Sequence, residues 1–380
     1  MAQQPVSAAT PPWIARQPLS TIYTLCYVAT ILARIPYWTL KFGLFSSLRP
    51  VPTWTFKQSL MATLTKVLVH MACVTEKPTR LSLEPGKAKG KETFCIAPTA
   101  SKADYVGPLK SSAVSPAPVG ITCFTAPTTT TTTTTTHEKP PSSSMVMLHV
   151  HGGGFVLGDG RGAQMGYGAS MLLEHAGVAC VYSPQYRLAC RPDPVPFPGA
   201  LQDVLTSYLY LVRGLEIPAG RVVLSGDSAG ANLAVGLLRY LAEHPLDGIP
   251  LPHTGRHVQP ALPDRHPAPS FVRWGAAAYS RLVPASDPYI SPLGHPFLTP
   301  VPLFVNLGAA EVLEVDGARW AREMRTVETG GEKRKNDIEL HYEDGAPHDT
   351  LLVGANLGWE DSVREVTTKI GEFIRRKSIV

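Results

Sequence analysis

The sequence has no dense stripe of basic residues and no paired-cysteine motif. Its 380 residues carry a net charge of only +5, with Lys and Arg scattered along the chain, which argues against nucleic-acid binding. The cysteines show neither a C-x-x-C pair nor the spacing of a disulfide framework; they are Cys26, Cys73, Cys95, Cys123, Cys180 and Cys190. We therefore expect reduced thiols, and an intracellular protein, cytoplasmic or endomembrane-associated, rather than a secreted one.

The N-terminal region lacks both a full-length spanning segment and a clear cleavage site. The apolar run LSTIYTLCYVATILA, residues 19–33, is shorter than the ~20 residues that a spanning helix needs. Apolar and aromatic residues continue to about residue 45. Three interpretations stay open: helices packed on the rest of the protein, a membrane anchor or interfacial helix through residues 19–45, or a cleaved signal. We expect residues 1–80 to form a helical cap segment.

Residues 81–380 have the pattern of an α/β domain. Short strand-like runs at 145–150, 178–186, 221–228 and 302–308 alternate with helical patterns, which predicts a mostly parallel sheet with helices on both faces. The threonine tract Thr128–Thr136 cannot bury enough surface to fold, so 127–144 is predicted to be a flexible insertion. The Pro- and His-rich interval 245–300 is predicted to be a cap-like insertion of loops and short helices.

A G-x-S-x-G pentapeptide, Gly226-Asp227-Ser228-Ala229-Gly230, joins a strand-like run to a helical pattern. Its glycines let the chain turn tightly and present the Ser228 hydroxyl at the start of a helix, where developing negative charge is favoured. The pattern therefore predicts a nucleophilic serine. The competing interpretation is an ordinary glycine-rich turn.

A second glycine cluster, His151-Gly152-Gly153-Gly154, follows the run at 145–150. Backbone N–H groups of glycines can approach a developing oxyanion closely, so we assign the donors to Gly153 and Gly154, with Ala229 as the third. His151 is expected to shape this loop. His149 and His151 form an H-x-H pair, but Gly153 and Gly154 occupy the places where a metallo-hydrolase needs further ligands, so no metal is expected.

Together these motifs resemble the hormone-sensitive-lipase branch of the α/β-hydrolase superfamily, over about residues 145–375. The similarity is carried by HGGGF, GDSAG, YRLACRPDPVPFPGALQDV at 186–204 and DPYISPL at 287–293. The N-terminal region, SLEPG and DYVGPL are similar to fungal steryl-acetyl-hydrolase-like esterases, some of them encoded in biosynthetic clusters. The resemblance implies structural roles for Tyr186 and Arg187, with Arg187 paired to Asp203, and no cofactor.

A serine hydroxyl needs a histidine to remove its proton. His348 lies in a Gly/Pro loop after the strand-like 338–344, where this fold places the base. The acid that orients the histidine should follow the run at 302–308, and the family pattern G-x-x-D-x-L falls on Gly308 to Leu313, with Glu311 at the acidic position. Glu314 and Asp316 are the rivals, and Asp316 is otherwise expected to be a helix N-cap.

The sequence thus predicts a serine hydrolase that cleaves a hydrophobic small-molecule ester through an acyl-enzyme, as in fungal secondary metabolism. Ser228, His348 and Glu311 would form the triad. The alternatives are an acyltransferase, lactonase or cyclase that uses the same triad, and a membrane-tethered binding protein without catalytic activity.

Overall fold

The computed structural model describes residues 12–85, 92–126, 143–256 and 270–378. Their centre is an eight-stranded sheet in the order β1-β2-β4-β3-β5-β6-β7-β10. Its strands are β1 Glu92–Ala97, β2 Val119–Thr125, β3 Val146–Val150, β4 Cys180–Gln185, β5 Val222–Gly226, β6 Thr254–Arg256, β7 Leu303–Gly308 and β10 Ile338–Glu343. Pairing is antiparallel around β2 and parallel from β4 to β10, so the prediction of a mostly parallel sheet is confirmed.

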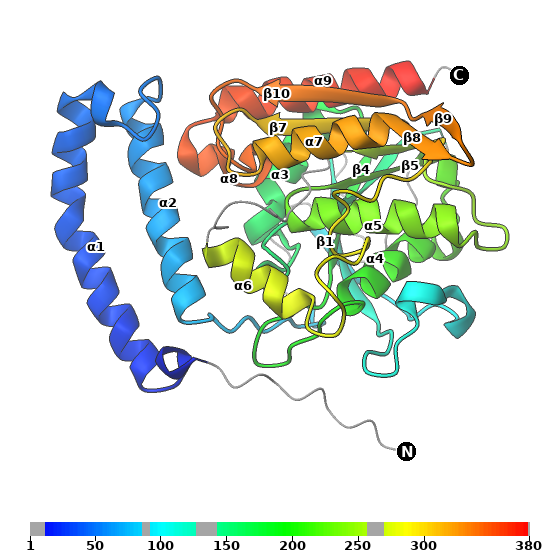
Figure 1. Cartoon of the computed structure of the whole chain (residues 1–380), viewed down its shortest axis with the longest axis horizontal. Coiled ribbons are helices and arrows are strands. Elements are labelled where there is room, and N and C mark those ends of the chain that lie inside the picture. The colour runs from blue at the N-terminus through cyan, green and yellow to red at the C-terminus, as the bar shows by residue number, and fades with distance from the viewer. Residues whose placement is uncertain (1–11, 86–91, 127–142, 257–269, 379–380) are drawn as a thin grey trace.

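Helices cover both faces of this sheet (Figure 1). One face carries α3 Gly162–His175, α8 Thr350–Leu357 and α9 Glu360–Lys377; the other carries α4 Gly199–Leu209, α5 Ala229–Glu243 and α7 Glu314–Arg325. Successive strand residues alternate between the two cores: Met147 packs in the cluster with α3 and α9, and Leu148 packs in the cluster with α4 and α5. This alternation follows from the two-residue period of a strand.

The interval 245–300 is not purely a cap-like insertion. It contains β6, which pairs with both β5 and β7 and so completes the middle of the sheet. The prediction missed β6 because the three residues Thr-Gly-Arg offer no apolar run. The same interval also supplies α6, Ser270–Tyr279. The predicted insertion at 127–144 lies outside the described residues, apart from its last two positions.

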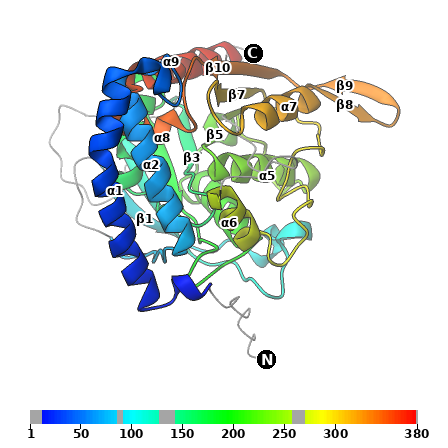
Figure 2. The same ribbon diagram turned by 60° about the vertical axis from the view of Figure 1, so that its left-hand side comes forward.

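The N-terminal region forms a helical hairpin of α1 Leu19–Leu44 and α2 Phe56–Val74. Helix α1 has 26 residues and continues through Pro36, so it is longer than the predicted apolar run. Figures 1 and 2 show α2 beside α6 and α8, with α1 on the outer side of α2. By length and composition α1 could cross a membrane, and only 6% of its most apolar window is buried.

Both ends of α2 are attached to the α/β domain. At its C-terminal end, Arg191 Nη2 donates to the carbonyl oxygens of Thr75 and Glu76, each at 3.1 Å. At its N-terminal end, Gln58 Nε2 donates to the carbonyl oxygen of Gly358 at 2.8 Å. These bonds fix α2 on the domain, whereas α1 packs on α2.

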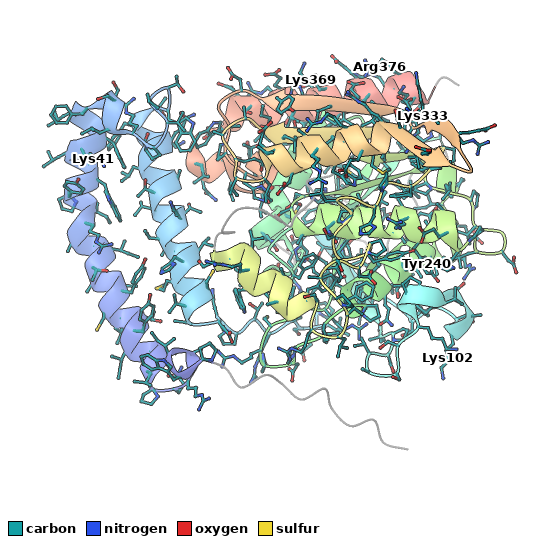
Figure 3. All side chains as sticks on the ribbon, in the orientation of Figure 1. Lys41, Lys102, Tyr240, Lys333, Lys369 and Arg376 are labelled. Carbon is teal, nitrogen blue, oxygen red and sulfur yellow. The ribbon has the colours of Figure 1, made fainter. Side chains whose placement is uncertain are left out.

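Further short elements lie at the periphery. A two-stranded sheet of β8 Thr326–Thr329 and β9 Glu332–Lys335 follows α7, and a π-helical turn, Tyr210–Gly214, extends α4. The 3-10 turns are Trp13–Ala15, Ser46–Leu48, Lys102–Asp104, Gly107–Leu109 and Ala219–Arg221. Figure 3 labels Tyr240 of α5 and Lys102 of the adjacent connection; the Tyr240 hydroxyl donates to the Asp104 carbonyl at 2.6 Å.

Candidate active site

Ser228 lies in the turn between β5 and α5, as the pentapeptide predicts. Its backbone is left-handed, with φ 51° and ψ −121°, a strained conformation for a residue with a side chain. The turn is tight because a Cβ on Gly230 would come within 2.0 Å of the Val150 carbonyl oxygen. Glycine at 230 therefore allows α5 to approach β3 and places the Ser228 hydroxyl at the helix start.

His348, in the loop between β10 and α8, links the serine to a carboxylate. Its Nε2 lies 2.9 Å from Ser228 Oγ, and its Nδ1 is hydrogen-bonded to Glu311 Oε2. The other Glu311 oxygen, Oε1, accepts from the Gly308 N–H at 3.1 Å. The glutamate side chain is fully buried, and 30% of the His348 side chain is exposed. The three predicted residues thus form one continuous hydrogen-bonded chain.

The electrostatic surroundings of His348 favour its charged form. Burial lowers its pKa, but the negative charge of Glu311 and the hydrogen bond to it outweigh burial, and the net shift is upward from the ordinary value. A carboxylate so placed stabilises the imidazolium that forms when the serine loses its proton. It also fixes the tautomer, because Nδ1–H donates to Glu311 and leaves Nε2 to accept from Ser228.

The two rival carboxylates belong to helix α7. The helix begins at Glu314, its N-cap is Leu313, and Asp316 lies inside the first turn. The prediction that Asp316 is the N-cap is therefore wrong, because the N-cap lies three residues earlier, at Leu313. Both Glu314 and Asp316 occupy the first turn, where the helix dipole stabilises negative charge. The carboxylate in contact with His348 is that of Glu311.

The predicted oxyanion donors lie in the loop after β3 and at the start of α5. Gly153 and Gly154 have φ angles of 119° and 61°, and the Gly153 carbonyl accepts from the N–H groups of Val156 and Leu157 at 3.1 and 2.9 Å. Within the described part of the chain, the N–H groups of Gly153, Gly154 and Ala229 have no protein acceptor. Three unpaired donors near a serine are what an oxyanion site requires.

His151 is fully buried beneath this loop. Its ring stacks on Tyr186 with centroids 4.2 Å apart, and its Nδ1–H donates to the Gly152 carbonyl at 2.7 Å. Burial lowers the pKa of His151 to about 4, although the bond to Gly152 opposes the shift. A neutral histidine in this position supports the loop conformation through its bond to Gly152 and its stacking on Tyr186.

The predicted pair of Arg187 and Asp203 is confirmed. Arg187 Nε lies 3.0 and 2.9 Å from the two carboxylate oxygens of Asp203, and Asp203 is buried. This contact ties the segment after β4 to α4. Among the described residues, no group of three or more His, Cys, Asp or Glu side chains could hold a metal ion.

Two polar residues beside the triad were not predicted. His149, considered only as a metal ligand, directs Nε2 to Asp227 Oδ1 at 2.8 Å and Nδ1 to Ser225 Oγ at 2.9 Å. Asp349 follows His348 directly, is buried, and has a left-handed φ of 61°. In the sequence, Asp349 could have been found because it follows the predicted base directly. His149 could have been found because it lies on β3, the strand that pairs with β5 before the pentapeptide.

Aromatic side chains of α6 and its surroundings lie against the oxyanion loop. Phe155 stacks on Tyr279 with ring centroids 4.0 Å apart. A Cβ on Gly154 would lie 3.0 Å from the ring of Phe271, and Phe271 packs edge-on against Trp274. Helix α6 therefore borders the site with partly buried apolar surface.

Comparison with known proteins identifies the class. The family model described as the α/β-hydrolase fold matches residues 147–352, which is more than half of the chain. The chain therefore belongs to this family, and the resemblance to its hormone-sensitive-lipase branch is confirmed.

Several characterised proteins are similar to this chain. It is 34% identical to an acetyl-hydrolase of Streptomyces hygroscopicus over 189 residues, 45% of this chain and 58% of that protein. It is 28% identical to an ethyl acetate hydrolase of Pseudomonas putida over 55% of this chain and 67% of that one. With mouse neutral cholesterol ester hydrolase 1 it shares 31% identity, over 24% of this chain and 22% of that protein. The chain thus spans under three fifths of the Streptomyces protein and a smaller part of the mouse one.

Solved structures are similar in fold. An esterase/lipase from an uncultured bacterium matches with a TM-score of 0.57 and 19% identity, over 84% of this chain and 99% of that one. A fungal esterase of Rhizomucor miehei matches with a TM-score of 0.53 and 19% identity, over 69% of this chain and 79% of that one. At these identities the similarity establishes the fold alone.

Proposed function

We propose that this protein is a carboxylic ester hydrolase that works through an acyl-enzyme on Ser228. The observation that carries the proposal is the hydrogen-bonded chain from Ser228 Oγ through His348 to Glu311, beside three unpaired N–H donors. Nucleophile, base, orienting acid and oxyanion donors are the complete set for acyl transfer. The names of the bacterial relatives, acetyl-hydrolase and ethyl acetate hydrolase, support the same class of reaction.

In the proposed mechanism, Ser228 Oγ attacks the ester carbonyl carbon while His348 Nε2 takes the hydroxyl proton. The carbonyl oxygen becomes an oxyanion and accepts from the N–H groups of Gly153, Gly154 and Ala229. Collapse of the intermediate breaks the ester C–O bond, and His348 returns the proton to the departing alcohol. Water then attacks the acyl-enzyme, again losing its proton to His348, and the acid is released with Ser228 restored.

Substitution of the nucleophile tests the proposal. Ser228→Ala should abolish hydrolysis of p-nitrophenyl acetate and covalent labelling by a fluorophosphonate probe, while circular dichroism stays unchanged. Ser170→Ala, at an exposed position on α3, is the control and should still be labelled. Labelling of Ser228→Ala at the wild-type rate would overturn the assignment. Product analysis with an added alcohol separates hydrolysis from acyl transfer, because a transferase would form the new ester.

We further propose that the substrate is a hydrophobic small molecule with a short acyl group, such as the acetyl ester of a sterol, terpenoid or polyketide of fungal secondary metabolism. Partly buried Phe271 and Trp274 beside the oxyanion loop support an apolar substrate. Contact with these aromatic side chains would bury apolar surface of the substrate, which favours its binding. Comparing kcat/KM for acetate esters of a sterol and of a polar alcohol tests this, and a preference for the polar ester would contradict it.

We also propose that residues 19–45 lie on a lipid surface. Helix α1 exposes large apolar side chains, among them Ile22, Leu25, Leu32, Leu40 and Leu44. The first 75 residues contain no Asp or Glu but six cations, Arg16, Arg34, Lys41, Arg49, Lys57 and Lys66, so the hairpin carries the net positive charge of the chain. Figure 3 places Lys41 near the α1 end at the hairpin turn. An apolar face flanked by cations favours an anionic membrane surface.

Vesicle flotation tests this second part. Full-length protein should float with vesicles of phosphatidylserine and phosphatidylcholine, and less with phosphatidylcholine alone. Leu25→Glu with Leu32→Glu should reduce flotation, because both side chains are more than 60% exposed on α1. Val315→Glu, at a 69% exposed position on α7, is the matched control. Equal flotation of the α1 variant and the control would contradict the proposal.

A further inference from the structure

A buried carboxylate that the proposed mechanism does not use lies at the end of β10. Glu343 is the last residue of that strand and is 6% exposed. Its Oε1 accepts from Asn306 Nδ2 at 2.5 Å, and its Oε2 accepts from the hydroxyls of Thr350 and Ser362 at 2.6 and 2.5 Å. Burying a carboxylate costs free energy unless hydrogen bonds compensate, and here three neutral donors do so.

The three donors come from three different elements around the proposed base. Asn306 lies on β7, the strand that precedes the acid Glu311. Thr350 is the first residue of α8 and lies two positions after His348. Ser362 lies in the first turn of α9. One side chain therefore ties the strand before the acid and the helix after the base to α9.

Backbone bonds join the turn that holds the acid to the loop that holds the base. The Glu343 carbonyl accepts from the Ala309 N–H at 2.9 Å, and the Ala346 carbonyl accepts from the Ala310 N–H at 2.9 Å. A Cβ on Gly308 would come 2.6 Å from the carbonyl oxygen of Ala346. The two segments are thus in direct contact, and the Glu343 side chain attaches them to α8 and α9.

Both hydrogen bonds of the His348 ring depend on the place of its loop. Nδ1 is bonded to Glu311 Oε2, and Nε2 lies 2.9 Å from Ser228 Oγ. A displacement of about 1 Å between catalytic groups can lower a rate by about 10²-fold.

We propose that Glu343 is a positioning residue: its carboxylate holds the loop that carries His348 against the turn that carries Glu311, and so keeps the base aligned with the serine. Glu343 acts through its hydrogen bonds to the elements on either side of the base and does not touch the reacting atoms. The effect on turnover rests on the proposed acyl-transfer function, whereas the effect on the His348 ring does not.

Two substitutions separate the hydrogen bonds of Glu343 from its negative charge. Glutamine keeps the shape of the side chain: its carbonyl accepts from Asn306, and its amide donates to the hydroxyl oxygens of Thr350 and Ser362, which accept as well as donate. Alanine removes every acceptor and leaves three buried donors without a partner. A positioning role is therefore kept by Glu343→Gln and lost in Glu343→Ala.

The kinetic test compares both variants with a control for stability. Glu343→Ala should lower kcat by about tenfold or more and change KM by less than about twofold, because the base is displaced and the surfaces that bind the ester are not. Glu343→Gln should keep kcat within about threefold of wild type. Ile370→Ala, at a fully buried position on α9, should lower the Tm through a cavity and leave kcat unchanged.

Three kinetic outcomes would overturn the positioning role. The first is a wild-type kcat in Glu343→Ala, and the second is an equal loss of kcat in Glu343→Gln and Glu343→Ala. The third is an equal loss in Ile370→Ala, because kcat would then follow stability alone. Active-site titration with a fluorophosphonate corrects each kcat for misfolded protein.

A milder variant covers the case in which Glu343→Ala does not fold. Thr350→Val keeps the shape of the side chain and removes the donor next to the base, so kcat should fall by about threefold or more. Thr368→Val, at an exposed position on α9, is the matched control and should keep the wild-type kcat. Equal kcat values in the two threonine variants would contradict the proposal.

NMR titration of the His348 ring measures the positioning without turnover. Burial lowers the pKa of His348, but the charge of Glu311 and the bond to it raise the pKa above its ordinary value, and the charges of Asp349 and Asp227 raise it further. If the loop moves away from Glu311 in Glu343→Ala, the pKa of His348 should fall below that of wild type. The ring signal is assigned by its absence from His348→Asn.

The glutamine variant completes this measurement. In Glu343→Gln the pKa of His348 should stay at the wild-type value. An equal fall in both variants would assign the effect to the charge of Glu343, and no fall in Glu343→Ala would show that the ring keeps its place; either result overturns the proposal. Failure of the Ser228→Ala test would leave the His348 titration intact, so the two proposals fail separately.

Discussion

The indole N–H of Trp54 donates to the carbonyl oxygen of Gly345 at 2.6 Å. Trp54 lies in the connection between α1 and α2, and Gly345 lies three residues before His348. The indole also packs edge-on against Trp359 with ring centroids 5.0 Å apart, in a cluster that includes buried Ala346. The N-terminal hairpin therefore touches the loop that carries the proposed base, although the two are far apart in sequence.

Removal of the Trp54 ring should loosen this loop. We expect Trp54→Ala to lower the free energy of unfolding by about 3 kcal/mol or more and to lower kcat. Trp54→Phe keeps an aromatic ring but loses the donor, and should cost about 1 kcal/mol. Thermal denaturation and steady-state kinetics measure both effects. Trp13→Ala, at a 68% exposed position before α1, is the control; an unchanged kcat in Trp54→Ala would show that the contact serves stability alone.

The choice of triad acid can be tested against its nearest rival. Glu311→Gln should lower kcat by about 10³- to 10⁴-fold, because an amide neither stabilises the imidazolium nor fixes the tautomer in the same way. Asp316→Asn should leave kcat close to wild type and cost at most about 1 kcal/mol of stability through the helix dipole. Active-site titration with a fluorophosphonate corrects for misfolded protein. A larger loss of kcat in Asp316→Asn than in Glu311→Gln would reverse the assignment.

The activity should depend on pH through His348. Burial lowers its pKa, but Glu311 outweighs burial and raises it, and the base works only when neutral. The kcat/KM should therefore fall as pH drops through a value above the ordinary ~6.5 of histidine. In Glu311→Gln the raising charge is gone and burial remains, so the residual activity should titrate at lower pH. The measurement is a pH profile of kcat/KM for both proteins. If the acidic fall in activity occurs at the same pH in Glu311→Gln as in wild type, Glu311 does not set this pKa.

The parts of the site that the sequence predicts well are those carried by contiguous motifs. Ser228 and the oxyanion glycines each lie where a buried strand ends, so a local pattern places them. Trp54 and Gly345 are separated by 291 positions, and no local pattern brings them together.

One error in the expected secondary structure has a local physical cause. The position of Asp316 before a helical run predicts an N-cap there, but α7 begins after Leu313. Leu313 offers no side-chain cap, so the true start of the helix gives no signal in the sequence. Helix α1 continues through Pro36, where a proline would usually end or bend a helix.

The close contact between α6 and the oxyanion loop gives a last prediction. Gly275 of α6 is buried, and a Cβ there would come 2.0 Å from the carbonyl oxygen of Gly154. Gly275→Ala should therefore push α6 and Gly154 apart and lower kcat by about 10²-fold, because the oxyanion donors lose their alignment. Gly166→Ala in α3, where no atom lies within 4 Å of the new Cβ, is the matched control and should stabilise its helix by about 1 kcal/mol. Steady-state kinetics and Tm measurements distinguish the two, and a Gly275→Ala protein with wild-type kcat would show that α6 can withdraw without disturbing the donors.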